Sequence, residues 1–358
     1  MPSASHPSKP LADLADRPSW IRSVLGHPAV TAVFALALVF TLGLLFPGNK
    51  AFYEWLNRRD MLDQAFYNWS THRDALRLVS ISGILACGMT VVIITAGIDL
   101  SVASVLALVA VSFSVFCIRW NWSAWTAIPA SLLIGVACGG VSGVFTAVFR
   151  IQPFIVTLAM MVFARGLAKT VSGGMKVSTA VQQSDGTYGN VDPPGVFSAI
   201  DSQILGGNVA VVSLILLACA VVTWVALSRL RWGRYVYAIG GNEEAARLSG
   251  VPVMSMKIAA YALAGLFSAI AGLCYAAQEQ QGDPEAGLGY ELNAIAIVVI
   301  GGTRLMGGHG GMGLTLLGTL IFAYLDKILS INAVPEASRL MLTGAIIVVA
   351  VLVQGRRR

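Results

Sequence analysis

Asp99 lies between two apolar runs, residues 78–96 and 100–118, neither of which carries a charge. Each run is about long enough to cross a hydrocarbon core of roughly 30 Å. A carboxylate is costly at the centre of a bilayer, and it is tolerated at the membrane boundary or in a hydrated cavity. The pattern therefore predicts a membrane protein in which Asp99 lies at the membrane boundary or in a hydrated cavity.

The rest of the chain has the same character. Hydrophobic residues make up 56% of the 358 residues and charged residues only 12%, whereas soluble domains carry about 25% charged residues. We therefore expect an all-α polytopic integral membrane protein with about ten transmembrane elements, some of them discontinuous. Arg165 and Lys169 predict a short element or a wet end after residue 163. The candidate elements are residues 29–46, 78–96, 102–118, 124–149, 154–163, 209–227, 258–277, 292–302, 313–325 and 340–353.

Lys and Arg residues near the ends of these runs predict the orientation. Their distribution favours cytoplasmic tails at residues 1–28 and 354–358, on either side of one transmembrane domain at residues 29–353. The polar connection 173–208 is then extracytoplasmic, and the connection 228–257 is cytoplasmic. The basic loop 47–75 disagrees with this orientation, because it would lie outside. The net charge of +6 fits such a bias in the loops and does not call for nucleic acid binding.

The connection 228–257 contains the signals for a short capped helix. After an expected turn at Gly240 and Gly241, Asn242 is a good N-cap residue. Acidic residues follow in the first turn, where they favour the helix dipole, and Gly250 ends the helix. A helix of this kind at a membrane face is either a docking knob for a soluble partner or a chance helix in a solvated loop. The docking interpretation assigns the contact to Gly241, Asn242, Glu243, Glu244, Ala245, Arg247 and Gly250.

Several motifs resemble the permease subunit of ABC importers for monosaccharides, of the ribose, xylose and galactose type. They occur in order between about residues 88 and 311, and together they are highly specific. The resemblance implies a cytoplasmic ATP-binding subunit, an extracytoplasmic sugar-binding protein, a second permease copy or a paralogue, and a multi-pass location among the lipids of a bacterial inner membrane. The motifs are Gly88-Met89-Thr90, Gly97-Ile98-Asp99-Leu100-Ser101-Val102, residues 152–158, Ala164-Arg165-Gly166, the stretch 237–250, residues 291–296 and residues 299–303.

The chain departs from the family pattern at three places. Ala103 stands where the family usually has Gly, and Asn293 stands where it usually has Asp. The loop 47–75 is longer than usual. The change at Asn293 removes one carboxylate from the membrane domain, so it argues against any mechanism that needs two acids there.

Five residues are candidates for the translocation pathway or for helix breaks: Gly97, Asp99, Ser101, Glu291 and Asn293. We expect Gly97 to permit a break, with Asp99 and Ser101 capping the free amides of the helix that starts at Val102. Direct contact of Asp99 with sugar is the alternative. Glu291 either caps the half-length element 292–302 or serves as a gate or pathway residue.

The sequence gives little support for catalysis by the chain itself. The Gly-rich stretch 301–311 lacks the Gly-Lys-Ser/Thr ending of a phosphate loop, so ATP hydrolysis is expected in a partner and the chain is not expected to be an enzyme. The scattered histidines and the cysteines in apolar runs predict neither a metal site nor a cofactor. The expected function is a permease subunit that imports a monosaccharide. The alternative is an ion-coupled secondary transporter with Asp99 as its coupling site.

Overall fold

The computed structural model describes residues 28–45, 66, 68–182, 188–190 and 192–355. Backbone groups have no water to bond to in hydrocarbon, so apolar runs of this length form helices, which pair their own amides and carbonyls. Eight described helices are long and apolar enough to cross a membrane. The membrane elements are α2 (Pro28–Leu45), α4 (Trp69–Ile94), α5 (Val102–Ser114), α6 (Ala124–Ala147), α7 (Pro153–Ser172), α9 (Val211–Ser228), α12 (Val253–Glu279), α13 (Tyr290–Gly301), α14 (Met312–Ile331) and α15 (Glu336–Gly355).

These elements correspond in order to the ten expected from the sequence, and the all-α architecture is confirmed. The π-helical turn η3 (Val115–Arg119) prolongs α5. In the described part of the connections lie three short helices, namely α8 (Gly195–Ile200), α10 (Arg231–Gly241) and α11 (Glu243–Leu248). The strands found among the described residues form antiparallel pairs of β1 (Val177–Ser178) with β6 (Gln281–Gly282), β2 (Ala180–Gln182) with β3 (Tyr188–Asn190), and β4 (Gln203–Ile204) with β5 (Val209–Ala210).

Two boundaries differ most from expectation. α4 begins at Trp69, well before residue 78, because the side chain of Asn68 caps the helix by accepting from the Ser70 amide at 3.1 Å. Of the two alternatives for residues 154–163, a short element or one with a wet end, the short element is wrong, because α7 is a complete helix of 20 residues. Arg165 can lie within it since its guanidinium donates to the carbonyl oxygens of Pro284 and Ala286, at 2.8 and 2.9 Å.

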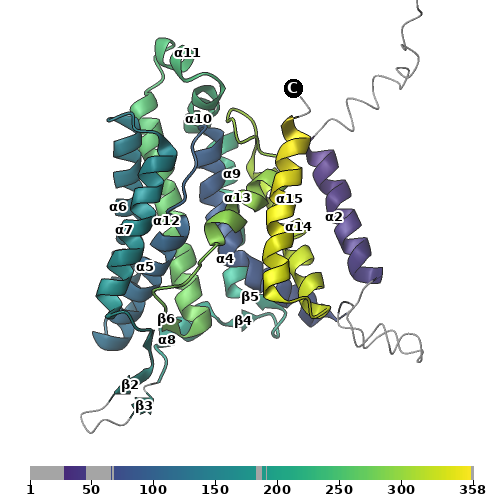
Figure 1. Cartoon of the computed structure of the whole chain (residues 1–358). Coiled ribbons are helices and arrows are strands. Elements are labelled where there is room, and N and C mark those ends of the chain that lie inside the picture. The colour runs from purple at the N-terminus through teal and green to yellow at the C-terminus, as the bar shows by residue number, and fades with distance from the viewer. Residues whose placement is uncertain (1–27, 46–65, 67, 183–187, 191, 356–358) are drawn as a thin grey trace, which may run out of the picture.

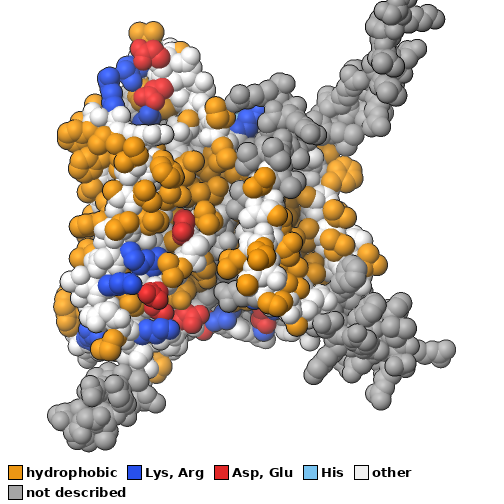
Figure 2. Space-filling model, in the orientation of Figure 1, with side chains coloured by type: hydrophobic (Ala, Val, Ile, Leu, Met, Phe, Trp, Pro, Cys, Tyr) orange, Lys and Arg blue, Asp and Glu red, His pale blue; other side chains and the backbone are white. Residues whose placement is uncertain are grey.

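The long helices lie side by side, with α10 and α11 at one end of the bundle and α8 with the short strands at the other (Figure 1). We call these the α11 end and the α8 end. The last turn of α15 lies at the α11 end. Figure 2 shows hydrophobic side chains over the middle of this face, with charged side chains gathered over α11 and across the α8 end. This distribution is the one that a lipid belt requires.

α4 is the central helix of the bundle. The helices differ in the buried share of an 18-residue apolar stretch. This share is 89% in α4 and 83% in the α5–η3 segment, but only 17% in α2. Ile84, Leu85 and Met89 of α4 belong to the largest apolar cluster, which also takes in residues of α5, α9, α12, α13 and α14. A change at the end of α4 therefore reaches most of the membrane domain.

Glycines bring α6 and α12 into backbone contact. Gly135, Gly139 and Gly143 recur at every fourth residue of α6, which places them on one face. A Cβ atom added at Gly139 would overlap the carbonyl oxygen of Tyr261, and one at Gly143 would lie 2.8 Å from Ile258 Cα. Small residues at this spacing allow close helix packing in membranes, where dispersion contacts replace the hydrophobic effect.

Gly139→Ala is therefore expected to destabilise the protein, because its methyl group must push α12 away from α6. Overpacking of this kind costs about 1–3 kcal/mol. Gly140→Ala is the matched control, since a Cβ atom at Gly140 meets nothing within 4 Å, and it should be neutral or slightly stabilising. Thermal unfolding of the two purified variants in detergent measures the difference. Equal transition temperatures would contradict the proposed role of the glycine face.

Candidate functional site

The break between α4 and α5 spans residues 95–101 and is built differently from the sequence expectation. Ala96 carries the left-handed backbone, with φ of +60°, a conformation that is unfavourable for a residue with a side chain. Gly97 does not adopt a positive φ. It is required for space instead, because a Cβ atom there would overlap the hydroxyl of Tyr261. The break at this position therefore depends on the space that Gly97 leaves, while the left-handed backbone belongs to Ala96.

Asp99 is only 1% exposed, and its carboxylate is held within the break. Its Oδ1 atom accepts hydrogen bonds from the Ser101 amide at 2.8 Å and from the Ser101 hydroxyl at 2.6 Å. Asp99 thus pairs one of the amides before α5, which is a structural task for a buried acid.

The Ser101 side chain does not cap α5, so that part of the capping expectation is wrong. Ser101 occupies the N-cap position, but its hydroxyl makes no bond to the helix amides because it points to Asp99. Its carbonyl oxygen accepts from Val105 at 2.9 Å. The adjacent Ile98 carbonyl accepts from the Thr157 hydroxyl of α7 at 3.3 Å, which fixes the break against a second helix.

The break meets two other segments at a contact that we call the glycine junction, formed by Ile94, Ala96, Gly240, Gly307 and Gly308. The Gly308 amide donates to the Ile94 carbonyl at 2.9 Å. A Cβ atom added at Gly240 would overlap that same carbonyl oxygen, and one at Gly307 would lie 2.8 Å from Ala96. The end of α4, the end of α10 and the 302–311 loop therefore touch backbone to backbone, with no side chain between them.

The 302–311 loop is a tight turn between α13 and α14. Gly302, Gly307 and Gly308 have φ of +110°, +84° and +71°, values that favour glycine. The Tyr237 hydroxyl of α10 donates to the Gly310 carbonyl at 3.0 Å. This bond attaches the loop to α10 at a second point beside the glycine junction.

The predicted capped helix is present as α11. Asn242 accepts from the Ala245 amide at 3.0 Å through its side-chain oxygen, and Gly250 follows the helix with φ of +81°. The turn expected at Gly240 and Gly241 is wrong, because both residues belong to the last turn of α10. The change of direction occurs at Asn242 alone, whose backbone is extended.

α11 is fastened along one side and free on the other. Lys257 of α12 contacts Glu243 at 2.5 Å, while Arg247 lies 3.3 Å from Glu243 and 3.4 Å from Glu244. Ala246 is buried against Ile239 and Val253. Leu248 is 83% exposed at the end of the helix. Sequence reasoning missed Leu248, although an apolar residue in the last turn of a polar segment was a visible signal.

A cavity of about 300 Å³ separates α11 from the break. Gly97 lines it together with Gly241, Asn242 and Glu243, so two groups of residues that the sequence proposed for different purposes share one space. Lys257 and Tyr261 complete its α12 side. A displacement of α11 therefore acts on the walls of the cavity that borders the break.

Glu291 and Asn293 lie elsewhere, in the first turns of α13. Gly289, with φ of +84°, precedes this helix, and Glu291 makes no capping hydrogen bond. Its carboxylate lies within electrostatic range of Arg165 on α7. Asn293 lines a second cavity, which includes Ser82 and Arg339. Gly97 and Asn293 thus line different cavities.

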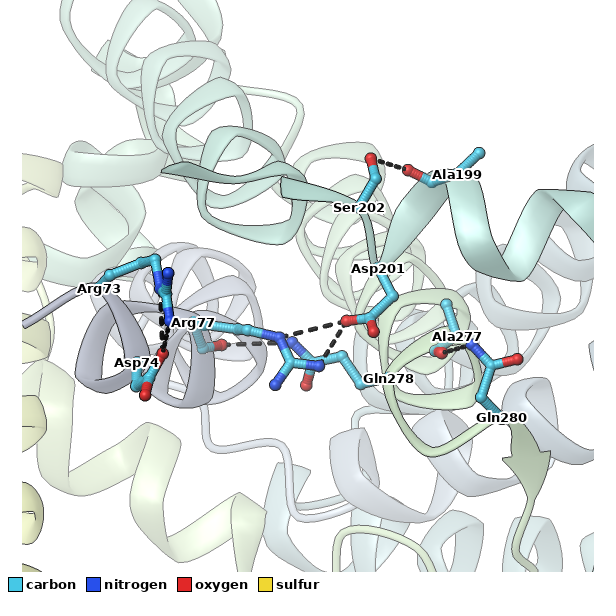
Figure 3. A network of polar contacts seen from close by, with 9 residues as sticks. All are labelled: Arg73, Asp74, Arg77, Ala199, Asp201, Ser202, Ala277, Gln278 and Gln280. Carbon is cyan, nitrogen blue, oxygen red and sulfur yellow. Dashed lines mark hydrogen bonds and ion pairs between the residues drawn. The ribbon is translucent and has the colours of Figure 1, made fainter. Parts of the chain in front are cut away.

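The α8 end is closed by ion pairs that the sequence did not predict. Figure 3 shows Arg77 of α4 reaching Asp201 after α8, with Nε and Nη2 at 3.2 and 2.5 Å from one carboxylate oxygen. Gln278 at the end of α12 donates to the Arg77 carbonyl at 3.4 Å. The only signal in the sequence was the run of charges before residue 78, and their partners come from distant segments.

The segment 283–286 is fixed to the α7 side by a second set of cations. Besides the two bonds from Arg165, Lys169 contacts Glu285 and Lys176 contacts Asp283, both at 3.0 Å. The side-chain hydrogen bond with Asp283 raises the pKa of Lys176. These contacts hold the chain that leads into α13.

Comparison with known proteins places this architecture. A family model described as the permease component of the branched-chain amino acid transport system matches residues 73–351. A ribose import permease protein of Escherichia coli strain K12 is 41% identical over 287 residues, which are 79% of this chain and 85% of that protein. An L-arabinose transport system permease protein of the same strain is 36% identical over 274 residues, 76% of this chain and 79% of the relative.

A fructose import permease protein of Rhizobium meliloti is 34% identical over 278 residues, which cover 78% of this chain and 76% of that protein. No solved structure matches. The apolar helices and these bacterial relatives identify a multi-pass protein of the bacterial inner membrane. The chain belongs to the family described as the branched-chain amino acid transport system permease component.

Proposed function

We propose that this chain is the transmembrane permease subunit of an ABC importer that carries a monosaccharide into the cytoplasm. The observation that carries the proposal is the glycine junction, which joins α10 and α11 to the break beside the central helix α4. Three relatives are named for the import or transport of ribose, arabinose and fructose, which supports a sugar as cargo. No cofactor or metal enters this proposal.

The orientation follows from basic residues. Arg229, Arg231, Arg234 and Arg304 belong to the connections of the α11 end, so this end faces the cytoplasm under the positive-inside rule. The segments 1–28 and 354–358 are then cytoplasmic as well, while 228–257 is the coupling loop. The segment 173–208 at the α8 end faces outward, where an extracytoplasmic sugar-binding protein docks. The loop 47–75 lies largely outside the described residues.

A separate ATP-binding subunit supplies the energy by moving α11. Leu248 and the acidic Glu244 are exposed on the free side of this helix and form the contact. The opposite side is fixed to α12 through Lys257, so the helix moves as a unit with its surroundings. Because Gly240 rests on the Ile94 carbonyl, displacement of α10 passes directly to the end of α4. A second permease copy or a paralogue completes the pathway.

Strong sugar binding within the pathway would slow release, so we place most of the sugar specificity in the binding protein. In the alternative function, an ion-coupled secondary transporter, Asp99 would bind the coupling ion. Both hydrogen bonds to Asp99 come from the neighbouring Ser101, which supports a structural role instead. A substitution at Asp99 distinguishes the permease function from the ion-coupled alternative.

Replacement of Glu243 and Glu244 by Ala should uncouple the ATP-binding subunit. The double variant loses the ion pairs with Lys257 and Arg247 that orient α11. A coupling free energy of about 1–3 kcal/mol corresponds to a 5- to 150-fold loss of sugar-stimulated ATPase activity. The assay uses the reconstituted importer, with membrane insertion measured in parallel. Asp74→Ala, which removes an acid whose ion pair is with the adjacent Arg73, is the control. Normal transport by the double variant would refute the coupling role.

Gly240→Ala should impair transport, because its methyl group cannot fit against the Ile94 carbonyl. Separation of α10 from α4 costs about 1–3 kcal/mol and breaks the mechanical link to the break. Gly313→Ala, in the first turn of α14, adds a methyl group where a Cβ atom meets nothing within 4 Å. Sugar uptake and thermal stability are compared for the two variants. The junction is not needed for coupling if Gly240→Ala transports as well as Gly313→Ala.

Asp99→Asn should keep most of the transport activity, because the amide oxygen can accept both hydrogen bonds from Ser101. Asp99→Leu leaves the buried Ser101 amide and hydroxyl without a partner, at a cost of about 1–3 kcal/mol for each group. We expect this variant to fold poorly or to transport slowly. Uptake and the yield of folded protein distinguish these results. A well-folded Asp99→Asn protein without transport would favour the ion-coupled alternative.

A further inference from the structure

A second cavity of about 310 Å³ lies toward the α8 end, between α4, α13, α14 and α15. Its volume is near the lower limit of small-molecule sites, which hold about 300–1,000 Å³. The rings of Tyr290 and Phe322 contribute to its wall. Polar or charged side chains from the four helices also line it, namely Ser82, Asn293, Asp326, Lys327, Arg339 and Thr343.

Several of these polar groups lack partners within the protein. Among the described residues, no hydrogen bond joins the side chain of Ser82, Asn293 or Lys327 to another group. The Nε atom of Arg339 is buried without a partner, although its Nη1 atom lies 3.3 Å from Asp326. The Arg339 Nε atom is the buried group among them, and buried polar groups are normally paired. The other three side chains are free to bond to an occupant of the cavity, so together they indicate a polar ligand.

We propose that this cavity is a transit site for a monosaccharide on the outer half of the pathway, an inference that rests on the proposed function. A sugar hydroxyl both donates and accepts. Asp326 and the Asn293 oxygen are acceptors, the Asn293 nitrogen, Lys327 and Arg339 are donors, and Ser82 can do either. The aromatic rings provide surface for the apolar face of the sugar. Asp326 pairs with Arg339, so among the charged lining residues Lys327 remains to donate to a sugar hydroxyl.

The position of the cavity connects it to the coupling machinery. Gly289, Tyr290 and Asn293 place the N-terminal end of α13 on its wall. The other end of this helix, at Gly301, enters the 302–311 loop that forms part of the glycine junction. A helix of 12 residues, about 18 Å long, thus has the cavity at one end and the junction at the other. Movement at the junction can therefore change the shape of the cavity.

Filling the cavity tests this assignment. Asn293→Trp places a large ring in it, whereas Leu292→Trp changes the neighbouring residue, which is 51% exposed on the outside of α13. Both variants are reconstituted with the ATP-binding subunit and the binding protein, and the uptake of labelled ribose, arabinose and fructose is measured. We expect uptake to be lost in Asn293→Trp and kept in Leu292→Trp. Equal uptake by the two variants would overturn the transit site.

A wild-type importer that takes up none of the sugars would overturn the proposed function itself, so the two failures are distinguishable. Because Asn293→Trp can also fail by misfolding, a second measurement uses Ser82→Cys in the full chain in nanodiscs. A charged thiol reagent modifies the new cysteine. The same treatment of the wild type measures the background modification of the native cysteines. Sugar should slow the modification, by about twofold at a concentration equal to its Kd.

Sorbitol at the same concentration is the control for osmotic effects in the thiol experiment. Modification that no sugar slows would overturn the proposal. The same holds if anionic lipid gives the only protection, which would indicate a lipid headgroup site. Complete protection in the dimer without sugar would identify an interface between permease copies and would also overturn it.

Discussion

The central helix α4 ends at Ile94, and the rest of the membrane domain depends on the groups that surround the carbonyl oxygen of this residue. The oxygen accepts from Gly308 and lies against Gly240, so two distant segments satisfy and cover the end of the helix. In hydrocarbon an unpaired carbonyl costs several kcal/mol, which makes this arrangement difficult to replace. The break can exist beside a buried helix because its polar backbone is paired by neighbours.

The glycine junction connects the two cavities through the backbone. One lies between α11 and the break, and it receives any displacement imposed on the coupling loop. The other lies across the membrane domain beside the first turn of α13. The 302–311 loop joins them, since it contacts both α4 and α10 and continues from α13. In the proposed function, this continuous backbone contact is what would connect the ATP-binding subunit at one end with the sugar site at the other.

Features encoded locally were predictable from the sequence, and features that depend on distant residues were not. The uncharged runs predicted the membrane elements, and Asn242 with Gly250 predicted the capped helix, because cap signals act within one turn. The full length of α7 depends on carbonyls of Pro284 and Ala286 that satisfy Arg165. The need for Gly97 comes from Tyr261, and the left-handed Ala96 carries no sequence signal. Which residues share a cavity required the three-dimensional packing.

The chain leading into α13 is fixed to the α7 side partly by exposed charges. Lys169 with Glu285 and Lys176 with Asp283 are ion pairs that solvent reaches. Exposed pairs weaken as salt rises, because the Debye length falls from about 10 Å at 0.1 M to 3 Å at 1 M. In the proposed orientation this segment meets the medium outside the inner membrane. The ionic strength of that compartment therefore sets how firmly the entrance to α13 is held.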